Sequence, residues 1–459
     1  MKIAKNFSAI PVVIVLELVA FQARAGATFT TLVSFNQTNG AYPNAGLVQA
    51  NDGNFYGTTA SGGPGGSGTN GTVFRMTPSG ALSSLISFDG TNGATPRAAL
   101  VQGTDGYFYG TTYNGGSNNA GTIFQMATNG TLTTLVNLAF ETGGYPIAGL
   151  IQGLDGNLYG TTALGGPGAY GTVFKLATNG TFATLVSFND TNGASPYAGL
   201  VQGNDGSLYG TTAFGGTNGG FGTIYKVTTN GTFTSLYSFT GTNDGKEAYA
   251  GLVQGADGSF YGTTFSGGTN GYGTVFKFGT NGMLTTLVSF ANTNGANPRA
   301  GLVQGTDGIF YGTTYLGGMY GDGTVFRLGT NGILTTLVSF DGNNGASPEA
   351  GLIQGADGSF YGTTAYGGTN GYGTVFRLSV NVPPPIFLKV EPTGATLTLT
   401  WSATVGQTYQ MLYKTNLSQT AWDNLNSTVT ATNPIMTTVD GMGPERQRFY
   451  RVLLLNVVN

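Results

Sequence analysis

The chain carries 20 acidic and 17 basic side chains but no histidine and no cysteine. This composition excludes Ser-His-Asp and Cys-His nucleophiles, histidine metal sites and imidazole acid–base chemistry. Glycoside hydrolysis stays open, because it needs only two carboxylates at a suitable separation. Six carboxylates in predicted loops are candidates for such a pair: Asp89, Glu141, Asp190, Glu247, Asp341 and Glu349. Nothing in the sequence singles out one pair, so we assign no catalytic residue.

Two sets of oxygen-bearing side chains are candidates for holding a cation. One is a series of seven aspartates, each directly before a glycine: Asp52, Asp105, Asp155, Asp205, Asp257, Asp307 and Asp357. Their constant place before glycine is better explained by hairpin turns, which favour Asp-Gly. The other is Asp341-Gly342-Asn343-Asn344, which falls short of a full oxygen-ligand loop for calcium. We therefore predict neither a metal site nor a cofactor.

Seven positions that differ in side chain offer the best candidate for a binding site. Each lies just before the first strand of a repeated unit, where we expect the mouth of a central channel. We call their occupants the ring residues: Asn44, Arg97, Ile147, Tyr197, Tyr249, Arg299 and Glu349. All except Ile147 are predicted to contact a ligand, since variable loop residues on a rigid repeated frame commonly form recognition surfaces.

Aromatic side chains are frequent in neighbouring loops, among Gly, Asn and Thr: Tyr113, Tyr170, Phe214, Phe221, Phe265, Tyr315, Tyr320, Tyr366 and Tyr372. Tyrosine beside asparagine and threonine suits carbohydrate, through ring stacking and hydroxyl hydrogen bonds. The alternative is that these rings simply cover the loops or vary neutrally.

The elements that must position these residues are internal repeats. The string Tyr-Gly-Thr-Thr occurs seven times, at intervals of 50 to 53 residues, beginning at Tyr56, Tyr109, Tyr159, Tyr209, Tyr261, Tyr311 and Tyr361. One unit is expected to hold four strands: Gly199–Gly203, Ser207–Thr212, Thr223–Val227 and Thr232–Phe239. Asp205-Gly206 and Asn230-Gly231 predict hairpins with type I′ turns, which need positive φ at both central residues. Four antiparallel strands in about 50 residues are typical of a propeller blade.

The two ends of the repeat region complete each other. Thr28–Phe35 reads as a fourth strand without the three that should precede it, and the last unit lacks its own fourth strand. We expect the N-terminal strand to close the last blade and remove the open edge. The prediction is an all-β fold, a seven-bladed propeller over residues 26–380. Seven first-strand glutamines are expected to satisfy backbone groups between blades rather than line the channel.

The repeated motif Ala-Gly-Leu-Val-Gln-Gly-x-Asp-Gly-x-Phe-Tyr-Gly-Thr-Thr, followed by Gly-Gly and Gly-Thr-Val-Phe, resembles that of the GloVer tandem-repeat family of bacterial secreted proteins. The resemblance covers about residues 28–380. It implies an exported or cell-surface protein with a C-terminal anchor that varies among members, and it implies no established catalytic residues.

Residues 386–459 have a different character. Leu397, Leu399 and Trp401 alternate with threonines, as in a half-buried strand. We expect a fibronectin-type-III-like β-sandwich with Trp401 and Tyr450 in its core. Trp422 suits a core or rim position better than a ligand contact. Residues 381–385 include three consecutive prolines and are expected to form a stiff linker.

Residues 1–25 have the pattern of a signal peptide: a basic start, an apolar run and Ala23-Arg24-Ala25. We therefore expect a secreted or cell-surface bacterial protein with no membrane span after cleavage. The net charge of −3 lacks the basic footprint that nucleic acid requires. The main hypothesis is a monomeric, non-enzymatic protein that binds glycan or protein. A polysaccharide-active enzyme and a purely structural envelope protein are the alternatives.

Overall fold

The computed structural model describes residues 27–64, 70–329, 332–380, 385–393, 396–404, 407–416, 418–441 and 448–455. The predicted signal peptide, and all of the predicted linker except Pro385, lie outside the described residues. The chain forms two compact units. One consists of Ala27–Gly305 and Phe310–Ser379, and the other includes Val380–Asn459. Every element in the described ranges is a β-strand.

The first unit contains seven four-stranded sheets, and in six of them the antiparallel strands follow one another in sequence order. The first strands are β2 (Val48–Gln49), β6 (Val101–Gln102), β10 (Ile151–Gln152), β14 (Val201–Gln202), β18 (Val253–Gln254), β22 (Val303–Gln304) and β26 (Ile353–Gln354). The second strands are β3 (Phe55–Thr59), β7 (Phe108–Thr112), β11 (Leu158–Thr162), β15 (Leu208–Thr212), β19 (Phe260–Thr264), β23 (Phe310–Thr314) and β27 (Phe360–Thr364).

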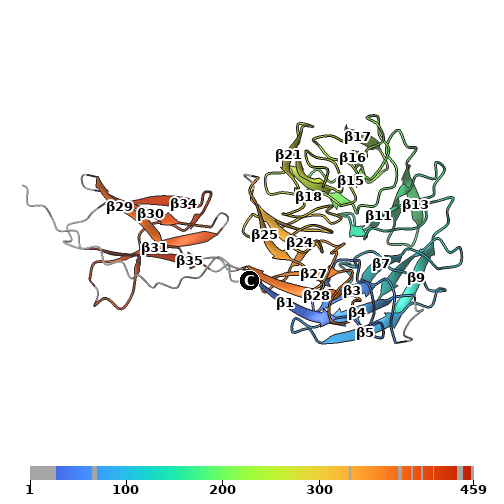
Figure 1. Cartoon of the computed structure of the whole chain (residues 1–459), viewed down its shortest axis with the longest axis horizontal. Coiled ribbons are helices and arrows are strands. Elements are labelled where there is room, and N and C mark those ends of the chain that lie inside the picture. Colours follow the sequence, from blue (N-terminus) through green and yellow to red (C-terminus); the bar gives the residue numbers. More distant parts are fainter. Residues whose placement is uncertain are drawn as a thin grey trace, which may run out of the picture. The chain divides into compact units, whose positions relative to one another are not determined.

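The third strands are β4 (Thr72–Met76), β8 (Thr122–Met126), β12 (Thr172–Leu176), β16 (Thr223–Val227), β20 (Thr274–Phe278), β24 (Thr324–Leu328) and β28 (Thr374–Val380). The fourth strands are β5 (Leu82–Ser87), β9 (Leu132–Asn137), β13 (Phe182–Ser187), β17 (Phe233–Ser238), β21 (Leu284–Ser289), β25 (Leu334–Ser339) and β1 (Ala27–Ser34). Figure 1 shows the sheets arranged around a centre, with β5, β9, β13 and β17 at the periphery, as in a propeller-like fold.

The N-terminal strand completes the last sheet, whose order is β1-β28-β27-β26. Phe35 N donates to Gly373 O at 3.0 Å, as Phe88 N donates to Gly71 O in the sheet of β2–β5. The predicted pairing of the two chain ends of the repeat region is therefore present. Because β1 covers β28, the sheet has no unpaired third strand.

Neighbouring sheets pack face to face through aromatic side chains. Tyr56 in β3 and Phe108 in β7 are both fully buried, and their ring centroids lie 4.2 Å apart. All five residues of β3 are buried, since sheets lie on both of its faces. Glycine is required at its centre, because a Cβ on Gly57 would lie 2.5 Å from Cζ of Phe74 in β4.

The first-strand glutamines join adjacent sheets. Gln102 Nε2 donates to Gly106 O in its own turn at 3.1 Å, and Gln102 Oε1 accepts from Asn51 N of the preceding sheet at 3.0 Å. The same acceptor role for Gln49 connects the last sheet back to the first, through Ala356 N at 2.8 Å. The prediction that these glutamines satisfy backbone groups between sheets is confirmed.

Two local predictions were wrong. Gly206 and Gly231 have positive φ, but Asp205 and Asn230 do not, so the hairpins are not type I′. Instead, Gly206 N donates to Gly203 O, and Gly206 is itself the one left-handed residue of the loop. This is the pattern of a three-residue hairpin loop. The first strand of this unit spans Val201–Gln202 rather than the five residues of Gly199–Gly203.

The second unit contains two antiparallel sheets. One has the order β29 (Phe387–Thr393), β30 (Thr396–Ser402), β34 (Ile435–Gly441). In the other, β31 (Thr408–Lys414) pairs with β32 (Asp423–Asn424), β33 (Val429–Thr430) and β35 (Phe449–Leu455). Trp401 is buried in the core with Leu397 and Leu399, as predicted, and Tyr450 packs against that cluster. Trp422 is half-buried beneath Lys414 Nζ, 5.0 Å from its ring centroid.

Among the described residues, no helix is long and apolar enough to cross a membrane.

Candidate functional site

The backbone that carries each ring residue is fixed at both sides. Thr95, two residues before Arg97, has a positive φ of 53°. Its N–H donates to Asn70 O in the loop of the preceding sheet at 2.7 Å, and its carbonyl accepts from Tyr113 N at 3.2 Å. The equivalent residues of the other units also have positive φ: Tyr42, Tyr145, Ser195, Glu247, Asn297 and Ser347. A repeated backbone frame therefore holds seven side chains that differ.

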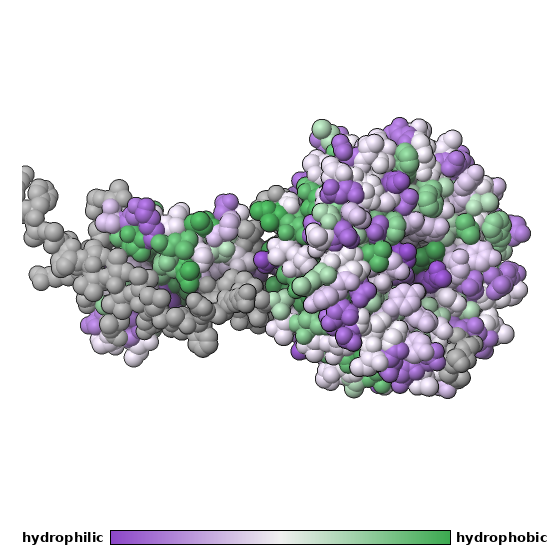
Figure 2. Space-filling view, viewed as in Figure 1, coloured by the Kyte–Doolittle hydropathy of each residue, from purple (hydrophilic) through white to green (hydrophobic). Residues whose placement is uncertain are grey.

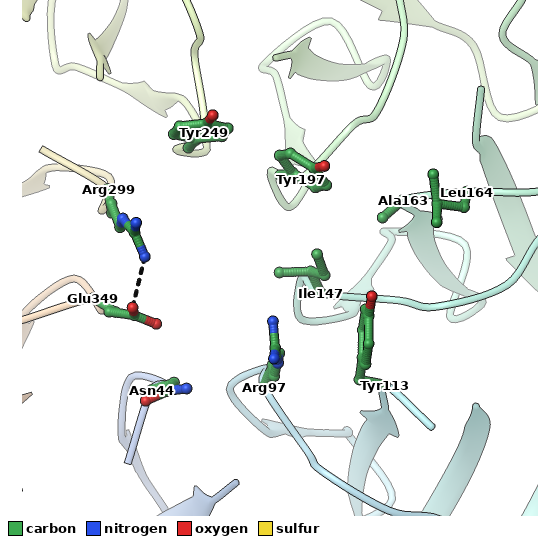
Figure 3. A pocket seen from close by; sticks show the side chains of 10 residues that line it. All are labelled: Asn44, Arg97, Tyr113, Ile147, Ala163, Leu164, Tyr197, Tyr249, Arg299 and Glu349. Carbon is green, nitrogen blue, oxygen red and sulfur yellow. Dashed lines mark hydrogen bonds and ion pairs between the residues drawn. The ribbon is translucent and has the colours of Figure 1, made fainter. Parts of the chain in front are cut away.

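All seven ring residues line one pocket of about 400 Å³, together with Tyr113, Ala163 and Leu164 (Figure 3). Residues separated by up to 305 positions in the chain thus form a single concave site. Its volume lies in the range of small-molecule sites, about 300–1,000 Å³. In Figure 2, hydrophilic and hydrophobic side chains meet at a hollow near the middle of the first unit.

One part of the pocket wall is charged. Arg299 Nη1 forms an ion pair with Glu349 Oε1 at 2.7 Å, drawn as a dashed line in Figure 3. The guanidinium carbon of Arg299 also lies 4.0 Å from the ring centroid of Tyr315, a cation–π contact. Glu349 therefore compensates the charge of Arg299, and Tyr315 holds the arginine in place.

A second arginine lies in the same wall without such compensation. Arg97 is exposed, and its guanidinium carbon lies 4.6 Å from the ring centroid of Tyr113. Within the described residues, no carboxylate lies within ion-pair distance of Arg97. The pocket lining consequently holds two arginines and one glutamate, a net positive charge.

The facing part of the wall is aromatic and apolar. The rings of Tyr197 and Tyr249 lie 5.4 Å apart, and Phe265 packs edge-on against Tyr249 at 5.0 Å. Burial raises the pKa of Tyr249, and the nearby charge of Glu247 adds to this effect. The hydroxyl is therefore neutral at physiological pH and can both donate and accept hydrogen bonds.

Two buried polar atoms of the lining residues have no hydrogen-bond partner: Asn44 Oδ1 and Arg299 Nε. Buried polar atoms are normally paired, and leaving one unpaired costs about 1–3 kcal/mol. Both atoms are buried from solvent, so neither is presented to a ligand in this arrangement of side chains.

The aromatic residues predicted from the loops differ in where they lie relative to the pocket. The aromatic residues that come sixteen positions after a ring residue lie beside it: Tyr113 next to Arg97, Phe265 next to Tyr249 and Tyr315 next to Arg299. Those at the loop tips, such as Tyr170 and Tyr320, are exposed and do not line the pocket. The first pairing was not predicted, although both ring arginines are followed by tyrosine at that spacing.

Only one of the six candidate carboxylates, Glu349, lines the pocket. Asp89 and Asp341 bind backbone N–H groups of their own loops, for example Asn92 N at 3.0 Å and Asn344 N at 2.9 Å. Glu247 accepts from Ser266 Oγ at 3.0 Å. In the part of the chain that the structure describes, no cluster of three or more acidic side chains is placed to hold a metal ion.

The turn aspartates serve the hairpins, as the glycine that follows each of them indicated. Asp205 Oδ1 accepts from Ser207 N at 3.0 Å, and its Oδ2 accepts from the Tyr209 hydroxyl at 2.9 Å. These residues lie at the opposite end of the strands from the pocket.

Fold and site together define a class: an all-β, propeller-like protein of tandem repeats whose loops form one pocket. The chain belongs to the Gloeobacter/Verrucomicrobia repeat family, whose model matches residues 19–135, 64–255 and 202–385. This membership confirms the resemblance stated from the motif.

Solved structures show a weak likeness. A putative 6-phosphogluconolactonase from Bacteroides fragilis is 16% identical, with a TM-score of 0.44, over 81% of this chain and 95% of its own. The Pseudomonas aeruginosa periplasmic gluconolactonase is 18% identical, with a TM-score of 0.43, over 65% and 85%. At these values the likeness assigns no activity to this chain. No curated protein matches it.

Proposed function

We propose that the protein is an exported, non-enzymatic binding protein that takes a saccharide into the ring-residue pocket. The observation that carries the proposal is that seven side chains, one from each repeated unit, line a single pocket with a tyrosine pair on one wall. Sugar rings stack on aromatic faces, and their hydroxyls match mixed donors and acceptors. Arg97, Arg299, Glu349 and Asn44 supply those polar groups.

The pocket lining supports binding over glycoside hydrolysis. A glycosidase needs two carboxylates, about 5–9.5 Å apart. Glu349 is the one carboxylate among the lining residues, and it is paired with Arg299 at 2.7 Å. In the described part of the chain, the pocket lining holds no second carboxylate that could act as the other acid or base in catalysis.

The scaffold we propose is a seven-bladed propeller that β1 closes, followed by a fibronectin-type-III-like sandwich. Seven four-stranded sheets and the pairing of β1 with β28 support the first part. For the second part, β29, β30 and β34 form one sheet and β31 with β35 the core of another, as in that sandwich class. Export rests on the signal-peptide pattern of residues 1–25. It is tested by sequencing the N-terminus of protein recovered outside the cell.

The function is tested by incubating the purified protein with a panel of insoluble polysaccharides. Protein depletion from the supernatant measures binding, and reducing sugar in the supernatant measures hydrolysis. We expect depletion without sugar release. The double variant Tyr197→Ala/Tyr249→Ala should weaken binding at least about 10-fold, because aromatic anchors dominate binding energy.

The matched control is Tyr107→Ala, which removes an exposed tyrosine from the turn at the other end of the strands. This variant should bind as the unaltered protein does. Sugar release that a single carboxylate substitution abolishes would favour the enzyme. Absence of depletion on every polysaccharide would favour a protein ligand or a structural role.

A further inference from the structure

The charges of the pocket wall are arranged unequally. Arg299 is neutralised by Glu349 at 2.7 Å, whereas Arg97 faces the same pocket with no carboxylate within ion-pair distance among the described residues. Figure 3 shows Arg97 extending into the pocket, apart from the Arg299–Glu349 pair. An arginine fork is a strong donor to a planar oxyanion, and such charge-assisted hydrogen bonds are about twice as strong as neutral ones.

Tyr113 keeps this free guanidinium in place. Its ring lies beneath Arg97, with 4.6 Å between the guanidinium carbon and the ring centroid. A cation held against an aromatic face loses less conformational entropy when it binds a ligand. The same pairing occurs at Arg299 and Tyr315, where the charge is already satisfied. The two arginines therefore have different roles, although their frames are alike.

We infer that the pocket takes an anionic saccharide, whose carboxylate or sulfate group pairs with Arg97 while a sugar ring lies against Tyr197 and Tyr249. This inference rests on the proposed function and names its ligand class. Arg97 is the residue that distinguishes an acidic saccharide from a neutral one, and Tyr113 is its positioning residue. Glu349 limits the positive charge of the pocket to one unpaired arginine.

The ligand test uses matched pairs that differ only in charge. Polygalacturonate and alginate are compared with their carboxyl-reduced, neutral forms, and dextran sulfate is compared with dextran. Affinity is measured by titration calorimetry on the purified protein. We expect at least one anionic polymer to bind about 10-fold or more tightly than its neutral partner. That preference should shrink as salt concentration rises. The anionic member that binds identifies carboxylate or sulfate as the recognised group. Equal affinity within every pair overturns the inference.

Variants assign the preference to Arg97. Arg97→Gln should lower affinity for the anionic polymer about 10- to 100-fold and affinity for its neutral partner by much less, so that the preference for the charged polymer shrinks. Glu349→Gln should raise affinity for the anionic polymer, because it releases the charge of Arg299. The control Arg75→Gln makes the same change in net charge near Asp52, in the turn network at the other end of the strands, and should leave both affinities within about twofold. If Arg97→Gln and Arg75→Gln act alike, the inference is overturned.

A failure of the anionic-ligand inference can be distinguished from a failure of the proposed saccharide-binding function. If the tyrosine double variant loses binding while Arg97→Gln leaves the charge preference intact, the pocket is a saccharide site and the anionic assignment is wrong. If neither substitution changes binding, the proposed function itself is wrong. Thermal unfolding of each variant separates loss of binding from loss of fold.

Discussion

The two ends of the repeated unit follow opposite rules. At the turn end, side chains are nearly the same in every unit: an aspartate, a tyrosine and, in six of the seven units, a lysine or arginine. At the pocket end, the backbone is repeated while the side chains differ. The first end uses side chains to hold the fold, so they vary little. The second uses backbone hydrogen bonds and a repeated threonine, such as Thr161 bonded to Ala198 O at 3.0 Å, which leaves its variable loop side chains available for recognition.

The unit around Asp205 shows how the turn end works. Tyr209 donates to Asp205 at 2.9 Å, and Lys226 forms an ion pair with Asp205 at 2.7 Å. Burial raises the pKa of Asp205, but hydrogen bonds from Lys226, Ser207 and Tyr209 outweigh it and lower the value to about 2. In the repeat that contains Tyr109, Gln125 replaces the cation and donates to the Tyr109 hydroxyl at 2.9 Å. The network thus accepts a neutral donor in place of the cation.

The largest expected difference comes from removing one tyrosine at each end. Tyr56→Ala at the turn end should reduce the free energy of unfolding by about 3–5 kcal/mol, because Tyr56 is fully buried against Phe108. Tyr197→Ala at the pocket end should reduce it by about 1 kcal/mol, since Tyr197 is half-buried. Urea denaturation measures both. Equal losses would mean that the pocket side chains also hold the fold.

A smaller difference is expected for two amides. Gln102→Ala should cost about 1–2 kcal/mol of stability, because it removes the acceptor of Asn51 N between two sheets. Asn44→Ala should change stability by less than about 0.5 kcal/mol, since Asn44 Oδ1 has no partner to lose. The same denaturation experiment compares them, and a cost for Asn44→Ala that matched the glutamine's would contradict the distinction.

The smallest expected effect is on how the free energy of unfolding changes at acidic pH. Because the folded-state pKa of Asp205 lies near 2, below the ordinary value of 3.8, its stabilisation is fully present above pH 4 and is lost as pH falls through 2. Solvent screening limits the contribution to less than about 1 kcal/mol, since the side chain of Asp205 is 43% exposed. The unfolding free energy of Asp205→Asn should therefore fall less steeply between pH 4 and pH 2. Parallel pH profiles for the variant and the unaltered protein would contradict this account.

The sequence predicted much of the pocket because the repeat fixes equivalent positions. Once Asn44 and Glu349 were placed before the first strands of their units, the ring followed from symmetry, and the structure brings them to one pocket. The chemistry between units was not predictable in this way. The ion pair of Arg299 with Glu349 joins side chains of two adjacent units. The distance between these two side chains depends on the rotation from one sheet to the next, and that rotation cannot be read from residue spacing in the sequence.

The repeat pattern by itself determined the strands, their antiparallel order and the completion of the last sheet by the N-terminus, because hairpin turns and hydrophobic runs are local signals. It failed on the turn type, because Asp-Gly fits both a type I′ turn and a three-residue loop, and the choice depends on the bonds of Gly203. Only the tertiary structure decided which aromatic rings lie beside the ring residues and which arginine remains unpaired. Those features arise where separate units meet, and contacts between units depend on distances in space rather than along the chain.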